Sequence, residues 1–165
     1  MTTTATPQEA VDALRSVGAT VATAESLTGG LVVAALVSVP GASAVVRGGV
    51  VAYAPDVKTG LLGVDEQLVA RHGTVDGEVA ARMAERARDA CGATYGIATT
   101  GVAGPDPSEG KPPGTVHVAV AGPHGTVERL LELSGDRAEI REATVGAALA
   151  LLVARVGEES SAPGR

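Results

Sequence analysis

Ser26 lies between an apolar stretch and the expected start of a helix that contains two glycines, in the segment TVATAESLTGGLVVAAL (residues 20–36). A serine directly before a helix commonly caps it by accepting a hydrogen bond from a backbone amide. Thr28 can fill that role here, which leaves the Ser26 hydroxyl available as a nucleophile. Gly29 and Gly30 would let a substrate approach the amides of the helix start, which favour anions and can receive a developing oxyanion.

A serine hydroxyl needs a base before it can attack a substrate. Lys58, in a short helix expected after the second strand, is one candidate, and His117, on an alternating strand, is another. His72 ends a polar helix and His124 sits at a hairpin tip, so neither is well placed. To act as a base, Lys58 must be largely neutral near pH 7, about 3 units below its ordinary pKa. Burial can lower the pKa that far, whereas a solvated surface lysine would stay charged.

Three charged residues are candidate substrate contacts. Glu25 is either such a contact or a partner that holds backbone or hydroxyl groups, since a carboxylate beside Lys58 would oppose a neutral amine. Arg137 and Arg141 lie one helical turn apart in the first turns of the last expected helix, where the helix dipole disfavours cations. The pair predicts a phosphate or carboxylate over that helix end, unless the arginines pair with neighbouring acids such as Glu139.

Thr100 and Gly101 belong to TTGVAGP (residues 99–105), a strand end with two glycines whose amides can wrap a ribose or phosphate. The segment is neither a Walker A loop nor a G-x-G-x-x-G turn. No metal-binding constellation and no cofactor motif appears, because the histidines are scattered and the single cysteine, Cys91, is expected to be a small hydrophobe. By itself the segment TTGVAGP is only a weak signal for a phosphate- or ribose-binding loop, and neither a metal nor a cofactor is expected.

The elements that must position these residues alternate between strand and helix. Helices are expected after a capping box at residues 6–9 and over 29–38, 56–62, 76–92 and about 136–156. Strands are expected over 19–25, 44–55 and 94–100, followed by a hairpin that turns at 122–125. This order predicts an α/β fold, a three-layer α/β/α sandwich on a mixed, mostly parallel sheet. Ligands of such sheets bind beyond the carboxyl ends of the strands, so the ends near Ser26, Tyr53 and Thr100 should converge.

Length and composition narrow the class of protein. The 165 residues fit a single domain over 1–165, with an expected core over about 7–156 and frayed ends. The net charge of −6, without a basic cluster, argues against a nucleic-acid partner. No apolar run is long enough for a membrane span and the N-terminus lacks the pattern of a signal peptide, which predicts a cytoplasmic protein.

Five ordered motifs resemble the C-terminal domain of the competence/damage-inducible protein CinA, a domain that also occurs alone as a nicotinamide-nucleotide amidohydrolase. The resemblance runs over about residues 7–155, and its motifs are TAESLTGG (23–30), GGVVAYAPDVKTGLLGV (48–64), TTGVAGP (99–105), KPPGTVHVAV (111–120) and DRAEIRE (136–142). The resemblance implies metal-independent deamidation of nicotinamide mononucleotide (NMN) to nicotinate mononucleotide and ammonia, and assembly as a homo-oligomer. One departure puts a helix cap or an interface in doubt, because relatives more often carry serine where this chain has Asp76.

Residue by residue, the resemblance makes Ser26 the nucleophile and Lys58 the base. Tyr53 and Thr100 match positions that line the site, and Arg141 is the match for a phosphate-binding arginine. The expected function is thus hydrolysis of NMN through a serine and a lysine. Two rivals remain open, namely a catalytically silent nucleotide-binding or regulatory module of the same fold and a hydrolase that uses His117 as its base.

Overall fold

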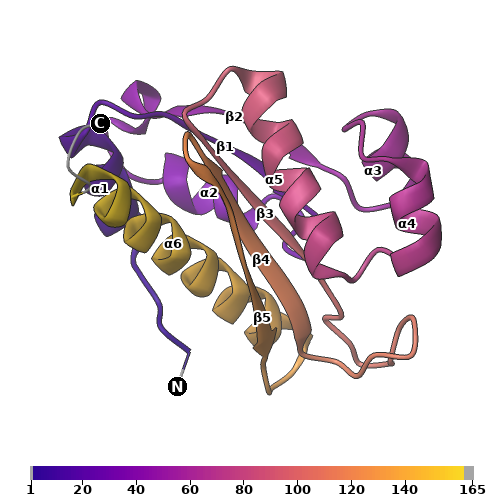
Figure 1. Cartoon of the computed structure of the whole chain (residues 1–165). Helices are drawn as coiled ribbons and strands as arrows, with labels where there is room; N and C mark the ends of the chain where they lie inside the picture. The colour runs from indigo at the N-terminus through magenta and orange to yellow at the C-terminus, as the bar shows by residue number, and fades with distance from the viewer. Residues whose placement is uncertain (1, 162–165) are drawn as a thin grey trace.

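A five-stranded sheet forms the middle layer of the computed structural model, which describes residues 2–161 (Figure 1). In the spatial order β2-β1-β3-β4-β5, the strands are β2 (Val46–Val51), β1 (Val21–Glu25), β3 (Tyr95–Gly101), β4 (Thr115–Gly122) and β5 (Gly125–Glu132). β1 pairs in parallel with β2 and β3, whereas β4 is antiparallel to both β3 and β5. Four of the five strands therefore run in the same direction, and the sheet is mixed, as predicted.

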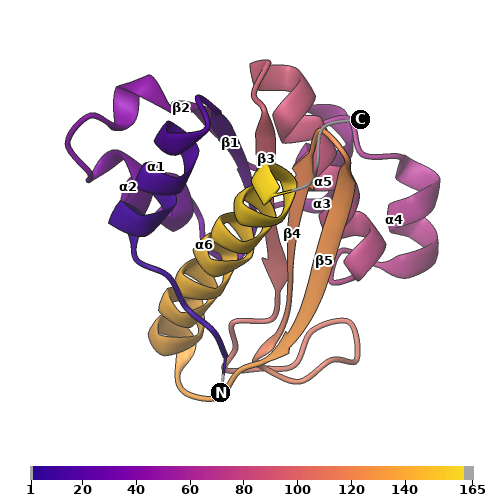
Figure 2. The ribbon, with the colours of Figure 1, turned by 60° about the vertical axis from the view of Figure 1, so that its left-hand side comes forward.

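Helices cover both faces of the sheet (Figures 1 and 2). One face carries α1 (Pro7–Ser16), α2 (Leu31–Val37) and α6 (Arg137–Ser161). The other carries α5 (Gly77–Cys91), with α3 (Pro55–Gly60) and α4 (Glu66–His72) beside it, and a short 3-10 turn, η1 (Ala42–Ala44), precedes β2. This arrangement confirms the predicted three-layer α/β/α sandwich. No helix within residues 2–161 combines the length and the apolarity that crossing a bilayer requires.

Small residues on one face of the sheet let α5 approach closely. The buried sheet residues of the hydrophobic cluster on this side are alanines, namely Ala22, Ala24, Ala98, Ala119 and Ala121. Gly96 of β3 lies under the helix, where an added Cβ would collide with the carbonyl oxygen of Ala84. The opposite face carries larger side chains such as Ile97 and Val118, which fill the space beneath α1, α2 and α6. Close packing of small and aliphatic side chains therefore fills the core with few aromatic rings.

Two helix starts follow from the chemistry of their capping residues. Thr6 and Glu9 form the predicted capping box of α1, with Glu9 N donating to Thr6 Oγ1 at 3.2 Å and Thr6 N donating to Glu9 Oε2 at 2.7 Å. Asp76 caps α5 by accepting hydrogen bonds from the amides of Glu78 and Val79. The aspartate thus caps the helix, and the doubt about this cap is removed.

The last helix is longer than the sequence predicts. The tail that was expected to fray after residue 156 is helical as far as Ser161, and residues 162–165 lie outside the described residues. Glu159 explains the extension, because it accepts a hydrogen bond from the Tyr95 hydroxyl at 2.6 Å and lies 2.9 Å from Arg155. The hydrogen bond from Tyr95 holds the last turns of α6 against β3, a tertiary effect that local sequence does not reveal.

Candidate active site

The carboxyl ends of three parallel strands meet at one edge of the sheet, as predicted. Glu25 at the end of β1 lies in register with Val51 of β2 and Thr99 of β3. Ser26 follows β1 directly, and its amide donates to the Thr99 carbonyl at 2.9 Å. A cleft of about 280 Å³ opens here, and its walls include Ser26, Tyr53, Thr100, Gly101, Glu109 and Arg137.

Lys58 points its amino group at Ser26 from below the cleft. Pro55 starts α3, which brings the Lys58 side chain under the sheet edge, where it is only 1% exposed. Lys58 Nζ lies 2.9 Å from Ser26 Oγ, 2.7 Å from the Ala52 carbonyl oxygen and 3.1 Å from that of Tyr53. In the neutral amine, two N–H groups can donate to the two carbonyls while the lone pair accepts the Ser26 hydroxyl proton. A nucleophile beside its base has this arrangement.

Burial makes the amine of Lys58 easier to deprotonate. It lowers the pKa of Lys58 from 10.5 to about 8, against the charge of Glu109, which raises it. About one molecule in ten therefore carries the neutral amine at pH 7, and about half do at pH 8. The rival base His117 is engaged elsewhere, because its Nδ1 lies 2.6 Å from Glu128 Oε1. Among residues 2–161, the hydrogen-bond partner of the Ser26 hydroxyl is Lys58.

Glu25 lies beneath the cleft instead of lining it. The side chain is 1% exposed, and its carboxylate accepts hydrogen bonds from the amides of Gly30, Val32 and Val33 at 3.2, 2.8 and 3.0 Å. Thr28 Oγ1 donates to the same carboxylate at 2.7 Å and is itself fully buried. The amides expected to receive an oxyanion are therefore occupied by Glu25. Of its two predicted roles, Glu25 holds backbone and hydroxyl groups, and these contacts fix the loop that carries Ser26.

Arg137 and Arg141 face different surroundings although they lie one turn apart. Arg137 lines the cleft and donates to the Gly104 carbonyl at 2.7 Å and to the Tyr53 hydroxyl at 3.1 Å. Arg141 donates to two carbonyls of the loop after Ser26, at 2.9 and 3.1 Å, and lies outside the cleft wall. Arg137 is therefore the arginine that lines the cleft, whereas the resemblance pointed to Arg141 as the phosphate-binding arginine. Arg141 is held by its hydrogen bonds to this loop, and the same hydrogen bonds fix the position of the loop.

The glycine-rich segments differ in what they offer to a ligand. Thr100 lines the cleft, but its hydroxyl already donates to the Thr74 carbonyl at 2.6 Å. Gly101 also lines the cleft, and an added Cβ there would lie 2.7 Å from the Thr115 carbonyl oxygen. Gly29 is turned inward, because its amide donates to the Ser26 carbonyl at 3.0 Å. Gly101 therefore remains a candidate for backbone contact, and Gly29 serves the turn.

Glu109 and Thr74 are cleft residues that sequence reasoning missed. Glu109 accepts hydrogen bonds from the Thr74 amide at 2.9 Å, the Thr74 hydroxyl at 2.7 Å and the Val75 amide at 3.0 Å. Although burial raises the pKa of the Glu109 carboxyl, these hydrogen bonds hold it below its ordinary value. A Glu-Gly pair inside a loop is a weak hairpin signal that could have drawn attention to Glu109.

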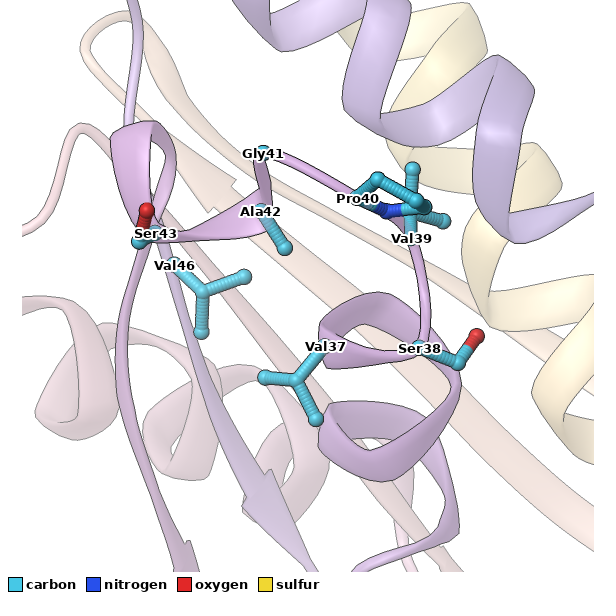
Figure 3. Close-up of a pocket in the computed structure, with 8 residues that line it drawn as sticks. All are labelled: Val37, Ser38, Val39, Pro40, Gly41, Ala42, Ser43 and Val46. Atoms are coloured by element: carbon cyan, nitrogen blue, oxygen red, sulfur yellow. The ribbon is translucent and has the colours of Figure 1, made fainter.

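A second hollow lies at the opposite end of the strands. Val37 and Val46 approach each other between the end of α2 and the start of β2 (Figure 3), and no side chain that lines this hollow is charged. Val46 pairs with Val21 at the start of β1, whereas Ser26 follows the other end, so the two sites lie about 16 Å apart along the strand. Within residues 2–161 no group of three or more His, Cys, Asp or Glu side chains is placed to hold a metal ion.

Residues 3–156 match the protein family described as the CinA C-terminal domain. A CinA-like protein from Frankia casuarinae is 57% identical over 134 residues, which cover 81% of this chain and 31% of that protein. A CinA-like protein from Anaeromyxobacter sp. is 51% identical over 149 residues, which cover 88% of this chain and 36% of that protein. The chain thus spans about a third of the length of these curated relatives.

Solved structures show the same fold. The competence/damage inducible protein CihA from Agrobacterium tumefaciens superposes with a TM-score of 0.85 at 38% identity, covering 90% of this chain and 93% of that one. A CinA superfamily protein from Klebsiella pneumoniae superposes with a TM-score of 0.90 at 29% identity, covering 92% and 96% of the two chains. The similarity therefore extends over nearly the whole length of both solved proteins.

Proposed function

This chain belongs to the CinA C-terminal domain family, and from that premise we propose that it hydrolyses NMN to nicotinate mononucleotide and ammonia. Ser26 is the nucleophile and Lys58 the base. The observation that carries the proposal is the 2.9 Å distance between Lys58 Nζ and Ser26 Oγ at the floor of a cleft. Burial of that amine lowers its pKa to about 8, so a fraction of it is neutral near pH 7.

The reaction begins with attack of Ser26 Oγ on the carboxamide carbon. Lys58 takes the hydroxyl proton as the new C–O bond forms, and the resulting ammonium offsets the charge of the oxyanion beside it. When the adduct collapses, the C–N bond breaks and Lys58 returns the proton to the departing nitrogen, which leaves as ammonia. Water then attacks the ester on Ser26, Lys58 carries one proton from water to Ser26 Oγ as the ester bond breaks, and the acid that forms loses its remaining proton to solvent and leaves as the carboxylate.

Arg137 supports a substrate that carries a phosphate. It is the cationic side chain of the cleft wall, and its guanidinium can donate two parallel hydrogen bonds to phosphate oxygens. A phosphate held there would orient the carboxamide at Ser26, so remote binding energy serves the reacting end. The positive pyridinium ring of NMN withdraws electrons from the carboxamide, which eases attack by a hydroxyl.

Removal of the nucleophile tests the proposal directly. We expect Ser26→Ala to fold normally and to release ammonia from NMN at least 100-fold more slowly than the wild type, a loss of the size that removing a nucleophile causes. Ser38→Ala is the matched control, because Ser38 is an exposed serine at the far end of α2, and it should keep full activity. A Ser26→Ala protein that retained more than a tenth of the activity would exclude Ser26 as the nucleophile.

A second candidate is a nucleotide-binding module without turnover. One observation favours it, because the three N–H groups of a charged Lys58 are matched by three acceptors, Ser26 Oγ and the carbonyls of Ala52 and Tyr53. The charged form is also the major one at pH 7. Thermal stabilisation of the wild type by NMN, without any ammonia release between pH 7 and 9, would favour this module over the enzyme.

A further inference from the structure

Glu109 has a backbone conformation that glutamate seldom adopts. Ser108 and Lys111 exchange backbone hydrogen bonds at 3.0 and 2.9 Å, so Glu109 and Gly110 are the two central residues of a tight turn. Their φ angles are +52° and +72°. A turn with two positive φ angles favours asparagine and glycine, because a longer side chain is strained there. Contacts of the Glu109 side chain must offset this strain.

The segment 73–75 supplies those contacts. The Thr74 amide lies 2.9 and 3.0 Å from the two carboxylate oxygens of Glu109, the Thr74 hydroxyl donates at 2.7 Å and the Val75 amide at 3.0 Å. Gly73 packs on the same carboxylate, where an added Cβ would lie 3.0 Å from the carboxyl carbon. These donors hold the pKa of Glu109 below its ordinary value although burial raises it. The carboxylate is therefore a fixed anion in the cleft wall.

The negative charge of Glu109 acts on Lys58, the proposed base. Among the described residues that line the cleft, Glu109 has the one negatively charged side chain and Arg137 the one positively charged side chain. Glu109 raises the pKa of Lys58, which in an empty cleft opposes the neutral amine that the reaction needs. An anion at this position therefore hinders the base unless the substrate brings a positive charge that offsets it.

We propose that Glu109 selects a carboxamide on a cationic ring, such as a pyridinium, over one on a neutral ring of the same shape. The inference rests on the proposed function and names the side chain that distinguishes its substrate class. A cationic ring beside Ser26 is attracted by Glu109 and offsets its charge at Lys58, so that Lys58 gives up its proton more readily. A neutral ring gains neither effect. Arg137 would hold the phosphate of both forms and so does not discriminate between them.

Binding measured by calorimetry separates ring charge from all other features of the ligand. The two ligands are NMN and its dihydro form, which has a neutral ring, and the host is the Ser26→Ala protein, in which neither is turned over. We expect Glu109→Gln to weaken NMN binding about tenfold and to change binding of the dihydro form by less than about twofold. Asp106→Asn is the matched control, because Asp106 is an exposed acid of the same loop, and it should change neither affinity.

The outcomes distinguish this inference from the proposed function. Equal weakening of both ligands by Glu109→Gln would mean that Glu109 only supports the wall, and would overturn its role in selection. If the wild type releases no ammonia while the charge preference still depends on Glu109, only the proposed function fails. If the Ser26→Ala protein does not bind NMN, both fail.

A second measurement leaves Glu109 in place and so does not depend on the folding of a variant at that position. The ligands are 1-methylnicotinamide, which is cationic, and nicotinamide, which is neutral, and neither carries a phosphate. We expect the Ser26→Ala protein to bind the cation at least about fivefold more tightly. Equal binding of the two would overturn the inference.

Discussion

Replacing Lys58 with methionine is expected to abolish activity and to stabilise the protein. Methionine is unbranched and flexible like lysine and carries no charge, so Lys58→Met removes the amine without emptying the space it fills. The Lys58→Met substitution should lower the rate of catalysis strongly, because Lys58 Nζ is the hydrogen-bond partner of Ser26 Oγ. Loss of a general base typically lowers the rate by about 100-fold or more. The gain in stability has a separate cause, which can be worked out from the structure.

The folded protein holds the charged form of Lys58 at a cost. The pKa of the amine is 10.5 in its ordinary state and about 8 in the folded protein, where the side chain is 1% exposed. A difference of about 2.5 between these values corresponds to about 3 kcal/mol of lost stability at pH 7. Methionine leaves the carbonyls of Ala52 and Tyr53 without the donor they share, which costs about 1 kcal/mol each. We therefore expect Lys58→Met to gain about 1 kcal/mol at pH 7.

The pH dependence provides a check that does not rely on the value of those hydrogen bonds. Because the pKa of Lys58 is depressed in the folded state, the unfolded chain binds more protons between about pH 8 and 10.5. The wild type therefore gains stability as the pH rises through this window, and the gain between pH 7 and pH 9 is about 1 kcal/mol. Methionine does not titrate. The advantage of Lys58→Met should thus shrink by that amount at pH 9, since all other groups are common to both proteins.

Urea unfolding of both proteins at pH 7 and pH 9 measures this change, and ammonia release from NMN measures activity. Lys111→Met is the matched control, because Lys111 is half-exposed and its replacement removes a lysine without removing a buried charge. An advantage of Lys58→Met that is the same at both pH values would refute the depressed pKa. A Lys58→Met protein that still hydrolyses NMN would refute Lys58 as the base.

Three further predictions concern the cleft and the two arginines at the start of α6. The kcat/KM for NMN should rise about tenfold from pH 7 to pH 9 with a midpoint near pH 8, as the amine of Lys58 becomes neutral, and a flat profile would contradict this. Arg137→Ala should raise KM about tenfold with an unchanged midpoint of urea unfolding, because its guanidinium lines the cleft. Arg141→Ala should instead destabilise the protein by about 1–3 kcal/mol, since it leaves two loop carbonyls unpaired. The opposite pattern for the two arginines would assign the phosphate to Arg141.

Local signals in the sequence determined the layers and the order of the elements. The capping box at Thr6 and Glu9, the cap at Asp76 and the glycine that ends α5 act within one or two turns of chain. The hydrophobic period of each segment likewise depends on neighbours along the sequence, so the α/β order and the convergence of three strand ends could be predicted. The end of α6 could not, because Glu159 is held by Tyr95, which lies 64 residues away in the chain.

Only the tertiary structure decided which side chains face the cleft. Glu25 and Ser26 are neighbours in sequence, yet the carboxylate turns inward to the start of α2 while the hydroxyl meets Lys58. Arg137 and Arg141 share a helix face, yet only the first lines the cleft. Glu109 reaches the same cleft through amides of Thr74 and Val75. Contacts of this kind depend on how distant segments of the chain pack together. The type of a residue determines what its side chain can bind, whereas the tertiary structure determines which partner lies within reach.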